Sequence, residues 1–134
     1  MKKILMLFAL CSVFMLFSVD CKAQLTINIR YTAENGNVQK YVEEMEKSGI
    51  ADKIRSIEGC LRYDYFFPAD DPNGLLLIDE WADQEALNRY HSSPVMQEAA
   101  ALREKYKLGG RQVRMFRPMT PPNAPQGQAP SGTR

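Results

Sequence analysis

The sequence has little of what most catalytic and metal sites require. Its 134 residues include one histidine, His91, and three cysteines, with no His/Cys cluster at metal-ligand spacing. It has no glycine-rich phosphate-binding loop and no serine motif that would complete a Ser-His-Asp hydrolase site. The formal net charge is +1, so no broad basic surface for nucleic acid is expected. These absences argue against metal catalysis, nucleotide binding and nucleic-acid binding.

The first 23 residues are typical of an export signal. Two lysines precede an apolar run over residues 4–19, which is short for a membrane-spanning helix of about 20 residues. Small side chains at Cys21 and Ala23 fit a cleavage site, so we expect cleavage after Ala23 and an exported, periplasmic or extracellular protein without a membrane anchor. The alternatives are an uncleaved anchor and lipidation at Cys21. Asp20 argues against lipidation, because a small residue normally precedes a lipid-accepting cysteine.

Cleavage would leave a nearly neutral domain with a tail. It removes three lysines and one aspartate, so the formal net charge changes from +1 to −1. Cys60 is then the one remaining cysteine, either buried as a small apolar side chain or free to pair between chains. Residues 118–134 hold five prolines and little to bury, which predicts a disordered tail after a domain at residues 24–117. A docking role for this tail is the alternative.

Hydrophobic periodicity predicts the element order β-α-β-β-α-β. Strands are expected at residues 25–31, 60–67, 75–81 and 111–117, the middle two joined as a hairpin by the turn residues 68–74. Helices are expected at residues 38–57, interrupted at Ser48-Gly49, and 83–106, capped by Asp83, restarted at Ser93-Pro94 and ended by Gly109-Gly110. This order is that of an α+β, ferredoxin-like fold, an antiparallel sheet with both helices on one face.

The two faces of the expected hairpin differ in character. The more apolar face should meet the helices and holds Leu61, Tyr63, Tyr65, Phe67, Leu75, Leu77, Asp79 and Trp81. The opposite face mixes apolar residues with Arg62 and Glu80, which could pair across the strands. Because this mixed face is too apolar to be left in water, we expect a homodimer packed sheet against sheet.

Four segments carry a resemblance to a known family. They are EGCLRYDYF at 58–66, DDPNG at 70–74, LIDEW at 77–81 and DQEALNRYHSSPVMQ at 83–97. Over most of residues 25–117 the chain resembles the antibiotic biosynthesis monooxygenase family, which belongs to the dimeric α+β barrel proteins. The resemblance implies a homodimer with a pocket between sheet and helices in each subunit.

The resemblance also implies a chemistry. Some members oxygenate phenols or quinols without flavin, metal or haem, so no cofactor and a small aromatic substrate are expected. Haem degradation by other relatives depends on an iron-ligating histidine, and Ala100 stands at that position here. Many quinol monooxygenases of the family have histidines where this chain has Tyr90 and Val95. These departures favour the alternative of a non-catalytic, ligand-binding or stress-related homodimer of the same fold.

Five residues are candidates for the site. His91 and Asp79 are the candidate proton acceptors, and Trp81, Tyr63 and Tyr90 are expected to shape the pocket and bind substrate. Each has a structural alternative. Trp81 and Tyr90 could serve as core, His91 could be a partly exposed residue at a helix edge, and Asp79 could be satisfied by a hydrogen bond from Tyr63 opposite it.

Overall fold

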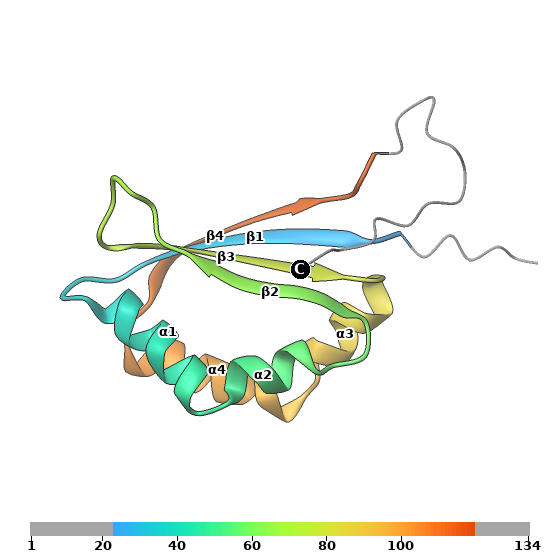
Figure 1. The fold of residues 1–134 in the computed structure, drawn as a ribbon, viewed down its shortest axis with the longest axis horizontal. Coiled ribbons are helices and arrows are strands. Elements are labelled where there is room, and N and C mark those ends of the chain that lie inside the picture. The colour runs from blue at the N-terminus through green and yellow to red at the C-terminus, as the bar shows by residue number, and fades with distance from the viewer. Residues whose placement is uncertain (1–22, 120–134) are drawn as a thin grey trace, which may run out of the picture.

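A four-stranded antiparallel sheet covered by helices on one face is the frame of the molecule (Figure 1). The structure, a computed structural model, describes residues 23–119, so the expectations for the export signal and for most of the tail lie outside the described residues. The strands are β1 (Leu25–Thr32), β2 (Cys60–Phe66), β3 (Gly74–Trp81) and β4 (Gly109–Phe116), in the sheet order β2-β3-β1-β4. The helices are α1 (Asn37–Lys47), α2 (Ile50–Arg55), α3 (Gln84–His91) and α4 (Pro94–Lys105).

This arrangement confirms the ferredoxin-like fold. In Figure 1 all the helices of residues 23–119 lie below the sheet, and no helix of these residues covers its upper face. In the part of the chain from residue 23 to 119, no helix is long and apolar enough to cross a membrane.

Local sequence signals set the helix boundaries. Gly49 has a left-handed φ of 79°, which separates α1 from α2. The Asp83 carboxylate accepts a hydrogen bond from the Ala86 amide at 2.8 Å and caps α3. Ser93 caps α4, and Pro94 occupies its first turn. These three boundaries match the sequence predictions.

The end of α4 differs from the prediction. The helix stops at Lys105, before the two glycines, because Lys107 adopts a left-handed φ of 56°. The amide of Leu108 donates to the carbonyl of Arg103 and that of Lys107 to Glu104, a pattern that closes a helix C-terminus. The glycines are therefore free to begin β4.

The hairpin of β2 and β3 has the predicted register over most of its length. Tyr63 lies opposite Asp79, and Arg62 lies opposite Glu80 and pairs with it, Nη1 to Oε1 at 3.4 Å. The placement of Leu61 and Phe67 toward the helices was wrong. The register shifts between Cys60 and Arg62, which leaves Leu61 54% exposed, and Phe67 lies beyond the end of β2 at 47% exposure.

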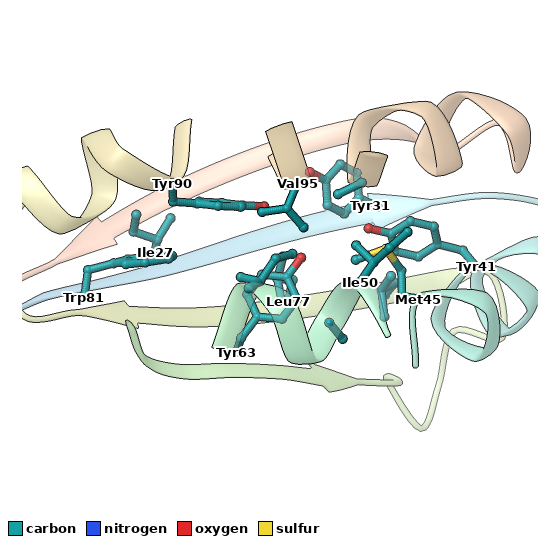
Figure 2. Close-up of a cluster of buried hydrophobic side chains, with 14 of the residues drawn as sticks. Ile27, Tyr31, Tyr41, Met45, Ile50, Tyr63, Leu77, Trp81, Tyr90 and Val95 are labelled. Carbon is teal, nitrogen blue, oxygen red and sulfur yellow. The ribbon is translucent and has the colours of Figure 1, made fainter. Parts of the chain in front are cut away.

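The core is solid beneath the hairpin. Tyr41 and Met45 from α1 and Ile54 from α2 are fully buried against the sheet. Figure 2 shows Tyr41, Met45 and Ile50 gathered together, with Tyr63 and Leu77 beside them. Cys60, for which a buried and a free state were both open, is half-buried, and burial raises the pKa of its thiol to about 11.

Candidate functional site

A cavity of about 420 Å³ lies between the sheet and the last two helices. Its lining comes from β1, β3 and β4 on one side and from α3 and α4 on the other. Its volume is within the range of small-molecule sites. The lining residues are Ile27, Ile29, Tyr31, Leu77, Asp79, Leu87, Tyr90, His91, Met96, Arg103, Arg111, Val113 and Met115. Most are apolar, and a few polar groups converge among them.

The cavity opens along β4. This strand is at the edge of the sheet and pairs with β1 alone, so that Ile29 lies opposite Val113 and Ile27 opposite Met115. The side chains of Val113 and Met115 are 42% and 51% exposed, although they line the cavity beside buried residues of β1. Helix packing therefore covers β1 and β3 but leaves a hollow next to β4.

The ring of Tyr90 forms one wall and stacks on Trp81 behind it. The rings of Trp81 and Tyr90 have centroids 5.1 Å apart and planes within 13° of parallel (Figure 2). Trp81 is fully buried behind Tyr90 and does not line the cavity, whereas Tyr90 does. Burial raises the pKa of Tyr90 to about 12, so its hydroxyl stays protonated at neutral pH and can donate a hydrogen bond.

Asp79 is the buried acid of the cavity. It is 2% exposed, and its Oδ2 accepts a hydrogen bond from the Trp81 indole nitrogen at 3.1 Å. Its other oxygen, Oδ1, has no hydrogen-bond partner among residues 23–119. Burial raises the pKa of this carboxyl to about 6, against the opposing effect of the Trp81 hydrogen bond. Asp79 can therefore exchange a proton near neutral pH.

The expected hydrogen bond between Tyr63 and Asp79 does not form. The two residues are directly opposite in the sheet, but the Tyr63 hydroxyl is buried without a hydrogen-bond partner among residues 23–119, as are those of Tyr41 and Tyr65. The indole of Trp81, two residues along the same strand and on the same face, occupies the carboxylate instead. Tyr63 is 1% exposed and does not line the cavity.

His91 lies at the mouth of the cavity. It is the last residue of α3, its ring is tilted against Tyr90 at a centroid distance of 5.7 Å, and much of its surface is in solvent. Partial burial, with a contribution from the charge of Arg111, lowers the pKa of its imidazole. The ring is therefore mostly neutral at pH 7 and able to accept a proton.

The cavity brings together three of the five candidate residues, Asp79, Tyr90 and His91, and leaves Trp81 and Tyr63 behind its wall. Sequence reasoning missed Arg103 and Arg111. Signals for both were present, because Arg103 interrupts the apolar stripe of α4 seven residues after Met96, and Arg111 alternates with Val113 and Met115. Across the described residues, no group of three or more His, Cys, Asp or Glu is placed to hold a metal ion.

Comparison with known proteins agrees with this fold. The profile of the family described as "Antibiotic biosynthesis monooxygenase" matches residues 24–102. The chain belongs to the antibiotic biosynthesis monooxygenase family. No curated protein matches the chain.

Several solved structures share the fold. SnoaB, a cofactor-independent oxygenase from Streptomyces nogalater, is 17% identical with a TM-score of 0.62, and the match covers 76% of this chain and 99% of that chain. A candidate antibiotic biosynthesis monooxygenase from Deinococcus radiodurans is 15% identical, with a TM-score of 0.63 and coverage of 75% and 97%. A conserved protein of unknown function from Bacteroides thetaiotaomicron is 16% identical, with a TM-score of 0.62 and coverage of 72% and 98%. At these identities the likeness is one of fold.

The structure also places the positions at which this family member departs from the expected histidines. Tyr90 lines the cavity, Val95 is buried in the first turn of α4, and Ala100 is exposed on α4. Of these three positions, position 90 alone lines the cavity, and its side chain there is the phenol of Tyr90 instead of an imidazole.

Proposed function

We propose that this protein is a cofactor-independent monooxygenase of a small phenol- or hydroquinone-type ring that binds in the cavity. The observation that carries the proposal is Asp79, a buried carboxyl with a pKa of about 6 and one unpartnered oxygen, in an otherwise mainly apolar, aromatic-walled cavity. Family membership supports the reaction type, because the family is named for monooxygenases.

The proposed reaction balances without a cofactor. Asp79, or His91 at the mouth, accepts the proton of a substrate hydroxyl, and the resulting electron-rich phenolate gives an electron to dioxygen. Recombination forms a carbon–oxygen bond, and loss of water leaves a quinone oxygen on the ring. A hydroquinone and one dioxygen thus yield one hydroxyquinone and one water, with all four electrons supplied by the substrate. The protein contributes a dry site, the proton acceptor and the Tyr90 hydroxyl as a hydrogen-bond donor.

Oxygen uptake with a panel of hydroquinones tests the proposal. We expect the wild type to consume oxygen. Substitution of the residue that acts as base, by Asp79→Asn or His91→Ala, should lower the rate at least tenfold, and the other substitution should have a weaker effect. Trp81→Ala should also lose activity, because Tyr90 and Asp79 both rest against the indole. Asp70→Asn, an exposed acid in the hairpin turn, is the matched control. No consumption above background with any member of the panel would rule the enzymatic proposal out.

A binding protein without turnover is the second candidate. The exposure of the one histidine and the tyrosine at position 90 favour it. Such a protein should be stabilised against heat by a bound ring, since any ligand of the native state raises the free energy of unfolding. Thermal stabilisation by a hydroquinone without oxygen uptake would select this candidate.

We further propose a homodimer that packs the helix-free faces of two sheets together. This face carries the exposed Phe66 and Phe116 on its two edge strands and Leu76 and Ile78 on β3, and the buried Oδ1 of Asn28, opposite Ile78, has no partner among residues 23–119. A second copy would cover the rings and could satisfy the amide. Light scattering of the purified protein at micromolar concentration should give twice the chain mass, and Ile78→Asp should give the monomer. A monomeric wild type would count against the proposal.

Export remains part of the proposed function. The reaction would then take place in the periplasm or outside the cell, after cleavage behind Ala23. Mass spectrometry of the mature N-terminus distinguishes cleavage at this point from an intact leader and from a lipid on Cys21.

A further inference from the structure

Arg103 is a half-buried cation that forms no ion pair with any acid between residues 23 and 119. Within residues 23–119 its Nη2 makes a long contact of 3.9 Å to the sulfur of Met96, and the guanidinium also approaches the Tyr41 hydroxyl. The guanidinium lies among the phenol rings of Tyr31, Tyr41 and Tyr90. Burial opposes its charge, but the neighbouring phenols outweigh burial and raise its pKa, so it stays a cation. An anion that approaches a partly buried cation of this kind gains a charge-assisted hydrogen bond.

Four other arginines of the domain are paired. Those that form an ion pair with a carboxylate are Arg30, Arg55, Arg62 and Arg89. Arg103 pairs with no described acid, although Glu98 and Glu104 occur on the same helix. The arrangement of α4 thus directs one arginine to the cavity rather than to a surface carboxylate.

Arg111 brings a second positive charge to the same cavity. It lies on β4, on the face that Val113 and Met115 share, and forms no ion pair with residues 23–119. Its charge acts on both Asp79 and His91, so it lies near the buried acid and near the mouth. Among the described lining residues, Asp79 is the only acid, so the two arginines exceed the negative charge available.

We propose that the ligand of this cavity is an aromatic acid, a hydroxylated ring that carries a carboxylate bound by Arg103 and Arg111. The apolar side chains and Tyr90 would hold the ring, and the carboxylate would supply the missing counter-charge. Guanidinium groups suit this task, because their N–H groups match the two oxygens of a carboxylate. The inference deepens the proposed function, on which it rests for turnover but not for binding.

A matched pair of probes tests the charge directly. The acid is 2,5-dihydroxybenzoate, and its methyl ester keeps the same hydroquinone ring without the negative charge. Calorimetric titration of the purified full protein should show the acid binding at least tenfold more tightly than the ester. Arg103→Gln and Arg111→Gln should each weaken binding of the acid about tenfold, as expected for the loss of a charge-assisted hydrogen bond. Binding of the ester should change less than about twofold, which also shows that the cavity is intact.

Arg117→Gln is the control, because it removes the same charge just beyond β4 and does not line the cavity. Equal binding of acid and ester, no binding of the acid, or an equal loss in Arg117→Gln would overturn the inference. If Arg103→Gln fails to fold, Arg111→Gln on the exposed strand decides the matter alone. Preference for the acid without oxygen uptake would keep this inference and remove the proposed enzyme. Oxygen uptake with the ester as fast as with the acid, together with equal binding of the two, would keep the proposed enzyme and remove this inference.

Discussion

The two halves of the helix-covered layer are built from similar residues but packed differently. Under α1 and α2 the core is solid, with Tyr41, Met45 and Ile54 at zero exposure. Under α3 and α4 a cavity of about 420 Å³ separates the helices from β4. Both halves contain methionine and tyrosine, so composition alone does not explain the difference.

The position of the edge strand explains it. At the solid edge, α2 packs against the edge strand β2. Arg55 Nε of α2 also donates a hydrogen bond to the Tyr63 carbonyl at 3.0 Å. At the opposite edge, all eight residues of β4 are exposed. One half therefore provides stability, and the other provides room for a ligand at the cost of unfilled space.

Two methionines give the strongest test of this comparison. Met45→Ala removes a fully buried side chain from the solid half and should cost about 2–5 kcal/mol of the free energy of unfolding. Met96→Ala enlarges a space that is already open and should cost about 1 kcal/mol, since no closed cavity is created. Urea denaturation of both variants measures the difference. Equal losses would mean that the second half is as tightly packed as the first.

The buried acid is the next test, and its effect depends on pH. The rise of the Asp79 pKa from 3.8 to about 6 means that the folded protein favours the protonated form, which corresponds to about 3 kcal/mol. This penalty is absent below about pH 4, grows as pH rises and is complete above the folded pKa. Asp79→Asn, which can still accept from Trp81, should therefore be more stable than the wild type by about 3 kcal/mol at pH 8.

Thermal unfolding at pH 4 and pH 8 checks this sign. The advantage of Asp79→Asn should shrink to less than about 1 kcal/mol at pH 4. A variant that is stabilised but inactive would mark Asp79 as a residue kept for chemistry at the expense of stability. Asp70→Asn, at an exposed acid in the hairpin turn, is the control measured alongside.

Much of the solid half could be predicted from the sequence, because its signals are local. Alternation and helical stripes placed the elements, turn residues placed the hairpin, and the register put Tyr63 opposite Asp79. The failures near the same strand have a physical cause. A single bulge residue reverses the facing of its neighbours, so Leu61 points away from the core although the pattern is regular.

The hollow half was only partly predictable. Asp79 and Tyr90 were placed at the site because both lie on inward-facing stripes of β3 and α3. The roles of Arg103 and Arg111 depend on the distance between α4 and β4, which no short pattern in the sequence encodes. Trp81 was expected to bind substrate, yet whether an inward aromatic lines a cavity or lies behind its wall depends on the packing of neighbouring side chains.

A pair of tyrosines tests the comparison on the smallest scale. The Tyr63 hydroxyl is buried in the solid half and has no hydrogen-bond partner within the described residues 23–119. Tyr63→Phe therefore removes an unsatisfied polar group and should be neutral or stabilising by up to about 1 kcal/mol. The Tyr90 hydroxyl belongs to the cavity wall, so Tyr90→Phe should leave stability nearly unchanged but weaken binding of 2,5-dihydroxybenzoate about fivefold, by loss of one hydrogen bond. Thermal unfolding and calorimetric titration of both variants separate the two effects. A loss of affinity in Tyr63→Phe equal to that in Tyr90→Phe would extend the ligand site into the half that we describe as solid, and the division between the halves would have to be abandoned.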